Sequence, residues 1–192
     1  MNDDQLIDEA LAGRSEAFGE LVRKYQDRLY HAMRHVLGSA DDAQDVVQDA
    51  FVQSLVKLET FNRSAAFYTW LFRIALNLAL SQRRRRRATV SIEALRDGTG
   101  QEPIDGGPAP DHRLSQEQRA AEVQAALATL DADFRTVLVL RDMDDLSYEE
   151  ISQVLDLPIG TVRSRLHRAR LQLREQLKDD KDTAKETPAA SP

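Results

Sequence analysis

The sequence of 192 residues contains no cysteine. Disulfide bonds, thiolate nucleophiles and cysteine-ligated zinc sites are therefore excluded, and the absence is consistent with a reducing compartment. Aromatic residues make up only 6% of the chain, whereas hydrophobic residues make up 42%, so a core has to be built mainly from aliphatic side chains. Glycine and proline are also scarce, with 8 and 6 residues, and they concentrate in residues 98–110.

Long hydrophobic runs are lacking as well. The longest apolar stretch covers residues 71–80, and Arg73 and Asn77 interrupt it. It is too short and too polar to span a bilayer. The first ten residues, MNDDQLIDEA, are acidic and lack the basic region and apolar run of a secretory signal. These features predict a cytoplasmic protein.

The patterns of metal sites and catalytic sites are missing too. Asp41, Asp45 and Asp49 recur every four residues, which is the spacing of a helical face and not of a calcium loop. His31 and His35 are four residues apart, a spacing that zinc can use, but no third ligand accompanies them. Neither a phosphate-binding glycine loop nor a nucleophile elbow is present. We therefore expect no metal, no cofactor and no enzymatic activity.

Charge is present but segregated along the chain. The formal net charge is −6, yet residues 61–90 contain 7 basic and no acidic side chains, and residues 158–178 contain 6 basic and 1 acidic side chain. The remainder of the chain is acidic. Two compact basic islands in an acidic protein indicate a polyanionic partner such as nucleic acid.

The glycine- and proline-rich stretch GTGQEPIDGGPAP predicts a flexible linker. We place the linker at residues 91–111, between an N-terminal domain (1–90) and a C-terminal domain (112–178). The last residues, 179–192, lack an apolar period, which predicts a disordered tail. Elsewhere apolar residues recur every three or four positions. The predicted fold is therefore all-α, with two small helical domains.

Helix boundaries follow from the same spacing and from capping signals. Val47, Phe51, Leu55 and Leu58 share a face, which predicts that this face is buried. Ser147 and Glu150 have the spacing of a capping box. The expected helices lie near residues 3–12, 15–37, 41–58 and 65–86 in the first domain and near 114–130, 132–142, 147–155 and 158–178 in the second.

Residues 146–166, LSYEEISQVLDLPIGTVRSRL, have the pattern of a helix-turn-helix. The apolar residues give each helix one buried side, and Arg163, Ser164, His167 and Arg168 point away from the core together. Such a face suits a helix in the DNA major groove, because its donors can reach guanine N7 and O6. Arg165, Arg170 and Arg174 suit phosphate contacts. The alternative is a helical hairpin with a solvated basic face.

A second polar strip is predicted on the helix at residues 67–84. Phe67, Leu71, Ile74 and Leu78 form a buried stripe on the helical wheel, whereas Trp70, Arg73, Asn77 and Arg84 lie on an adjacent strip. An aromatic, an amide and two guanidiniums suit single-stranded DNA, because they can stack on a base, read its edge and neutralise phosphates. Core packing is the alternative for Trp70 and Phe61, and a solvated helix end is the alternative for the arginines at 83–87.

These segments resemble a known family. LSYEEISQVLDLPIGTVRSRLHRAR is similar to the region 4 helix-turn-helix of extracytoplasmic-function (ECF) sigma factors, the RpoE-like members of the sigma-70 family. DDAQDVVQDAFVQSLVKLETF resembles region 2.2 running into 2.3, and SAAFYTWLFRIALNLALSQRRR resembles regions 2.3 to 2.4. The matches stand in the family's order and cover about 15–88 and 112–176.

The resemblance implies a sigma factor that binds core RNA polymerase and directs promoter-specific initiation. It implies that a region 2 helical bundle recognises and melts the −10 element, and that region 4 binds the −35 element. The implied −10 residues are Phe61, Asn62, Trp70, Arg73, Asn77 and Arg84, with Phe61 and Asn62 in a loop that captures a flipped base. The implied −35 residues are Thr161, Arg163, Ser164, His167 and Arg168.

The resemblance also implies protein partners. Asp45, Gln48, Asp49 and Gln53 lie on a helix that the family docks on the clamp helices of the polymerase β′ subunit, and region 4 is implied to meet the β flap. A solvated acidic face is the alternative for these four residues. Family members are often held by an anti-sigma factor, which can keep them at the inner membrane, and many serve stress responses.

Two rival interpretations remain open at this point. One is a helix-turn-helix regulator whose N-terminal half senses a ligand and which binds only duplex DNA. The other is a pure interaction module. Residues 61–87 discriminate between them and a sigma factor, because a duplex-binding regulator does not need a strand-capturing segment.

Overall fold

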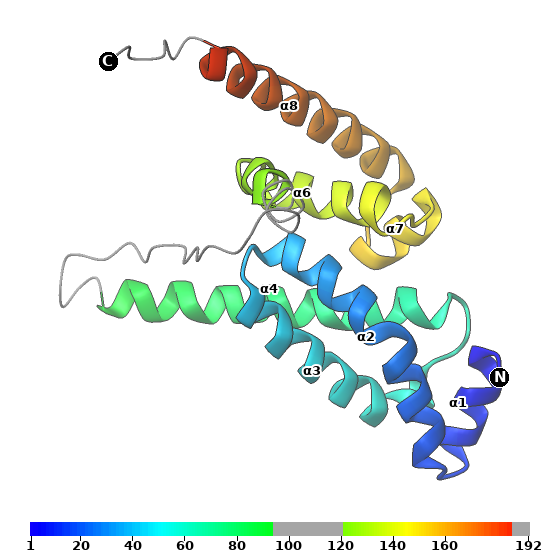
Figure 1. Ribbon diagram of the computed structural model, residues 1–192. Helices are drawn as coiled ribbons and strands as arrows, with labels where there is room; N and C mark the ends of the chain where they lie inside the picture. The colour runs from blue at the N-terminus through cyan, green and yellow to red at the C-terminus, as the bar shows by residue number, and fades with distance from the viewer. Residues whose placement is uncertain (94–120, 186–192) are drawn as a thin grey trace, which may run out of the picture. The chain divides into compact units, whose positions relative to one another are not determined.

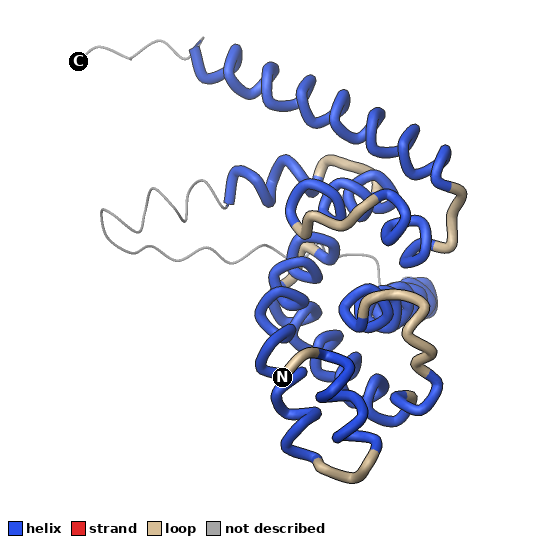
Figure 2. Tube along the Cα trace, turned by 90° about the vertical axis from the view of Figure 1, so that its right-hand side faces the viewer, coloured by secondary structure: helices blue, strands red, loops and turns tan. Residues whose placement is uncertain are grey.

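The computed structural model describes residues 1–93 and 121–185, and all regular structure in these ranges is helical (Figures 1 and 2). The expectation of an all-α fold is confirmed. The chain divides into two compact units, Met1–Gln118 and Arg119–Pro192. Within the described ranges, no helix is both long enough and apolar enough to cross a membrane.

The first unit contains α1 (Asp3–Leu11), α2 (Ser15–Leu37), α3 (Ala40–Val56), the 3₁₀ turn η1 (Leu58–Thr60) and α4 (Phe67–Glu93). Helix α3 packs against both α2 and α4, and α1 packs on α2. The boundaries follow from local chemistry. Gly38 ends α2 at φ 78°, a left-handed conformation that glycine adopts readily. The Ser39 hydroxyl then accepts the Asp42 N–H at 3.2 Å and caps α3.

The core of the first unit combines large aliphatic side chains with small ones. Leu21, Leu29, Met33, Leu71 and Phe72 are fully buried. Three alanines, Ala43, Ala50 and Ala75, are also fully buried, and such small side chains allow neighbouring helices to approach closely. The ring of Tyr25 on α2 stacks on Tyr68 of α4 at 5.4 Å between centroids, and this contact fixes the rotation of α4 against α2.

Helix α1 is fastened to α2 on one side. Leu6 and Ile7 are buried, and the Asp3 carboxylate accepts hydrogen bonds from Tyr25 Oη and from Lys24 Nζ, the latter at 2.5 Å. Burial, followed by the hydrogen bond to Asp3, raises the pKa of Tyr25 above its ordinary value. The hydrogen bond to Asp3 also raises the pKa of Lys24. Helix α1 is thus an integral part of this unit.

The second unit contains a helix at residues 121–128, α6 (Ala132–Leu138), the π-helical turn η2 (Val139–Met143), α7 (Tyr148–Leu155) and α8 (Ile159–Lys185). The predicted capping box is confirmed: Glu150 N–H donates to Ser147 Oγ at 3.2 Å, and Ser147 N–H donates to Glu150 Oε2 at 2.8 Å. Asp156 ends α7 in the left-handed region. Leu127, Val137, Leu140, Ile151, Val162, Leu166 and Ala169 are buried and form the core.

Both long helices extend beyond the predicted domain boundaries. Helix α4 continues past residue 90 to Glu93, and α8 continues past residue 178 to Lys185. No glycine or proline occurs between Gly38 and Gly98 or between Gly160 and Pro188, so no helix-breaking residue stops either helix earlier. The rest of the predicted linker up to residue 111, and residues 186–192 of the predicted tail, lie outside the described residues.

The two units are expected to unfold independently, and Trp70 makes this testable because it is the single tryptophan of the chain. Phe72→Ala should lower the free energy of unfolding of the first unit by about 3–5 kcal/mol, since it leaves a cavity in the core. Ile151→Ala should destabilise the second unit by about 2–5 kcal/mol. In urea titrations, only Phe72→Ala should shift the Trp70 fluorescence transition, whereas circular dichroism should report both. Equal shifts of the Trp70 transition would contradict the division.

Candidate nucleic-acid interface

An aromatic cluster stands where the loop 61–66 enters α4. The ring of Phe61 contacts Trp70 at 5.1 Å and Phe67 at 5.8 Å between centroids. Phe67 is buried, whereas Phe61 and Trp70 are partly exposed. Core packing therefore accounts for Phe67 and for one side of the other two rings. Their remaining surface is open to a partner that can stack.

The loop itself has a defined conformation. Asn62 is exposed, and its side-chain oxygen accepts the Ser64 N–H at 3.1 Å and the Ser64 hydroxyl at 2.7 Å. These bonds form an Asx turn. Arg63, between them, adopts φ 57°. Its guanidinium pairs with Asp8 and lies 3.8 Å from Asp4 Oδ1.

The polar strip predicted on α4 is exposed. Arg73, Asn77 and Arg84 are exposed beside Trp70, and Leu71 and Ile74 on the other side of the helix are buried. Arg84 Nε donates to the Leu80 carbonyl at 3.4 Å. The side chains that the helical wheel grouped together are therefore grouped in the structure, with an aromatic at one end and guanidiniums along the strip.

Helix α3 presents a different surface. Asp45, Gln48 and Asp49 are exposed, and Gln53 is partly exposed. The predicted burial of Leu55 is wrong, because Leu55 is 51% exposed whereas Ser54 is fully buried. The Ser54 hydroxyl donates to the Phe51 carbonyl at 2.8 Å. A small, internally satisfied side chain thus occupies the packed position, and the larger leucine faces outward.

Sequence reasoning also missed an exposed apolar group at the end of α3. Val52, Leu55 and Val56 are 58%, 51% and 78% exposed. Their spacing of three and four residues continues the face of Gln48 and Asp49, so one side of α3 is acidic at its start and apolar at its end. The sequence signal that could have revealed this apolar group is that it continues the polar face of the same helix. Apolar residues at helical spacing are normally assigned to the core.

The helix-turn-helix presents its predicted face. Arg163, Ser164, His167 and Arg168 are exposed on α8, and Thr161 is partly exposed. Thr161, Ser164 and Arg168, together with Arg165, line one side of a groove of about 470 Å³ whose other side is formed by residues 131–134. Three of the five predicted contact residues therefore share one concave surface.

Two arginines that were expected to contact phosphates pair with carboxylates of the same unit. Arg165 pairs with Asp133 at 2.9 Å. Arg170 donates to both carboxylate oxygens of Asp142, with the Nε bond at 3.0 Å, and the hydrogen bond raises the pKa of Arg170. These pairs join α8 to α6 and η2. Arg174 is exposed and remains a candidate for a phosphate contact.

Tyr148 is a further residue that sequence reasoning did not assign to the site. The guanidinium carbons of Arg141 and Arg163 lie 5.3 Å and 5.5 Å from the centre of its ring. Cation–π attraction operates at these distances. Tyr148 therefore helps to restrain the Arg163 guanidinium on the exposed face.

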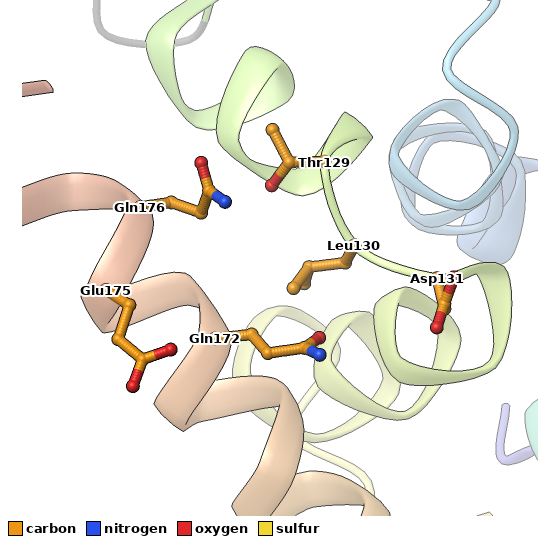
Figure 3. Close-up of a pocket in the computed structure, with 6 residues that line it drawn as sticks. All are labelled: Thr129, Leu130, Asp131, Gln172, Glu175 and Gln176. Carbon is orange, nitrogen blue, oxygen red and sulfur yellow. The ribbon is translucent and has the colours of Figure 1, made fainter. Parts of the chain in front are cut away.

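A second groove of about 310 Å³ lies between residues 129–131 and α8 (Figure 3). Thr129, Leu130 and Asp131 face Gln172, Glu175 and Gln176 across it. It contains none of the predicted contact residues. Across the described ranges, no three acidic or histidine side chains gather in a way that could hold a metal ion.

Comparisons with known proteins match both units. The family model for sigma-70 region 2 matches residues 21–89, and that for sigma-70 region 4 matches residues 113–173. The ECF RNA polymerase sigma factor SigW of Bacillus subtilis is 33% identical over 178 residues, covering 90% of this chain and 95% of SigW. The ECF RNA polymerase sigma-E factor of Escherichia coli is 35% identical over 179 residues, covering 88% and 91%.

The chain belongs to the ECF sigma factors of the sigma-70 family. Solved structures agree: CnrH in complex with the cytosolic domain of CnrY has a TM-score of 0.70 at 30% identity, covering 93% of this chain and 98% of CnrH. RpoE of Bartonella quintana, solved with the anti-sigma factor NepR, has a TM-score of 0.68 at 27% identity, covering 84% and 96%. The curated relatives are sigma factors, which are transcription regulators rather than enzymes. Because region 2 is matched, the rival of a ligand-sensing regulator is disfavoured.

The exposed apolar group of this sigma factor is expected to contribute little to folding. Val56→Ser should change the free energy of unfolding by less than about 0.5 kcal/mol, because surface substitutions rarely do more. Val46→Ser on the same helix is the matched comparison. Val46 is fully buried, so its replacement should cost roughly 2–4 kcal/mol through a cavity and a buried hydroxyl. Urea unfolding followed by Trp70 fluorescence measures both, and a large loss in Val56→Ser would show that this face packs on the protein itself.

Proposed function

We propose that this sigma factor binds core RNA polymerase and directs initiation at promoters with defined −10 and −35 elements. The first unit recognises and melts the −10 element, and the second binds the −35 element as duplex. The observation that carries this proposal is the presence of two exposed faces of different chemistry. One combines aromatic rings, an amide and guanidiniums on a loop and helix, and the other is an arginine-rich helix face.

The first face suits an unpaired strand. Phe61 and Trp70 offer ring surface on which a base can stack, Asn62 and Asn77 offer amides that can read a base edge, and Arg73 and Arg84 offer charge for phosphates. Stacking on aromatic side chains and a positively charged track are the general means of holding single strands. A base that has left the duplex also needs such a pocket to offset lost stacking.

The second face suits the major groove. Arg163 and Arg168 lie about 1.4 turns apart on α8, with Ser164 and His167 between them. Bidentate arginine–guanine contacts are the commonest specific reading mode. Thr161 lies near the start of the same helix, where helix-turn-helix proteins contact DNA. The Tyr148 ring holds Arg163 on this face.

Helix α3 supports the proposed docking on polymerase. Its face runs from Asp45, Gln48 and Asp49 through Gln53 to the exposed apolar group, and an interface needs both polar complementarity and buried apolar area. The proposed partner surface is the clamp helices of the β′ subunit, with region 4 on the β flap. RpoE of Bartonella quintana is bound by an anti-sigma factor, and we propose a comparable inhibitor that holds this protein in the cytoplasm or at the inner membrane.

Reconstitution with core polymerase tests the proposal. Genomic DNA transcribed in vitro by core enzyme plus this protein should give transcripts that start at an enriched set of promoters, because specific initiation needs both contacts. Core enzyme alone is the control. Starts distributed at random, equal with and without the protein, would refute promoter recognition.

The two faces should differ in the step that they affect. Arg168→Ala should weaken binding of the holoenzyme to duplex −35 DNA by about 1–3 kcal/mol, measured by fluorescence anisotropy. Asn77→Ala should leave that binding unchanged and slow open-complex formation, measured by permanganate reactivity of unpaired thymines. Equal loss of duplex binding from both substitutions would favour a protein that reads duplex DNA alone.

A further inference from the structure

Arg63 is the most unusual backbone position near the proposed −10 face, which consists of Phe61, Asn62, Trp70, Arg73, Asn77 and Arg84. Its φ of 57° lies in the left-handed region, which side chains other than glycine, asparagine and aspartate adopt uncommonly. An outlier of this kind persists only when surrounding contacts hold it, and such outliers cluster at ligand-binding sites. The residue directly precedes Ser64 and follows Asn62, so its conformation sets the direction of the loop that carries Asn62.

The contacts that hold Arg63 come from the N-terminal helix. The Arg63 guanidinium pairs with the Asp8 carboxylate, and Arg63 Nε lies 3.8 Å from Asp4 Oδ1. Asp4 and Asp8 are one turn apart and exposed on α1. Neither is needed to attach α1 to α2, since Leu6, Ile7 and Asp3 provide that attachment. Figure 1 shows the loop between α3 and α4 descending toward α1.

The pairing of Arg63 with Asp8 and Asp4 acts as a tether, and its effect reaches the proposed base-reading groups through the loop itself. Asn62 is locked to Ser64 by two hydrogen bonds across Arg63, so holding Arg63 also holds the Asn62 side chain. Phe61 is fixed on its other side by Trp70 and Phe67. The loop is therefore attached at two points, one aromatic and one ionic, and only the ionic point involves a different helix.

We propose that Asp8, assisted by Asp4, positions the base-capturing loop through Arg63, so that α1 contributes to −10 selectivity without contacting DNA. This inference rests on the proposed function above. A preorganised loop lowers the conformational cost of binding the correct base. Arg63 is thus a positioning residue, occupied by carboxylates, and not a phosphate contact.

The test uses the full-length protein in holoenzyme at a promoter found by the transcription assay. Templates carry an abasic site at successive −10 positions, and the position with the largest loss of open complex defines the captured base. Discrimination is the ratio of open-complex formation on the intact template to that on this abasic template. We expect Asp8→Asn and Arg63→Asn each to lower discrimination by roughly three- to fivefold, the upper end of what an exposed ion pair contributes. Asparagine tolerates the left-handed conformation, so Arg63→Asn removes the tether with little backbone strain.

Glu9→Gln is the matched control. It removes one negative charge from the same helix and breaks the Arg14–Glu9 pair of 3.0 Å, which does not involve the loop, and discrimination should stay within about twofold. The charge exchange Asp8→Arg with Arg63→Asp should restore discrimination. Urea unfolding should show the same stability for Asp8→Asn and Glu9→Gln.

The opposite role for Arg63 predicts opposite results. If Arg63 contacts a phosphate, Asp8→Asn frees the Arg63 guanidinium and strengthens open complexes on intact and abasic templates alike. The charge exchange then gives no rescue of discrimination. Either result overturns the positioning role. If wild-type holoenzyme discriminates at no −10 position, the proposed function itself fails. If the wild type and Asp8→Asn discriminate equally, only the tether is refuted.

Discussion

The rotational setting of α4 is the constraint on which the first unit depends. A helix turns by about 100° per residue, so a rotation of α4 equivalent to one residue would bury Asn77 and expose Leu71. The stacking of Tyr25 on Tyr68 and the full burial of Ala43 and Ala50 on α3 hold α4 in its observed setting. The exposed polar strip on α4 therefore depends for its orientation on buried contacts made by other faces of the helix.

In the second unit, different contacts hold the rotational setting of α8. Val162, Leu166 and Ala169 bury one side of α8, and the pairs Arg165–Asp133 and Arg170–Asp142 join its flanks to α6 and η2. These arginines were predicted to contact DNA because a basic helix suggests it. In the structure both pair with carboxylates of the same unit, so part of their charge is already neutralised within the protein.

The sequence was sufficient for features that depend on neighbours along one helix. Apolar spacing predicted the helices, Ser147 and Glu150 predicted a cap, and a helical wheel placed Arg73 and Asn77 on one strip. The sequence was insufficient for features that depend on contacts between distant segments of the chain. Which of Ser54 and Leu55 is buried depends on how closely the neighbouring helices approach α3. The Arg63–Asp8 pair joins residues that are separated by 55 positions in the chain. The late ends of α4 and α8 reflect the absence of any breaker rather than a positive signal.

The exposed strip on α4 also has a consequence for how the protein is attracted to DNA. Electrostatic attraction to phosphates is felt only within about 8 Å at physiological salt, whereas the chain as a whole carries a net charge of −6. Because non-specific DNA affinity comes mainly from neutralised phosphates, the attraction of an isolated copy to DNA depends on its local basic surfaces and not on its net charge. That attraction falls steeply as the salt concentration rises, because binding to phosphates releases counterions.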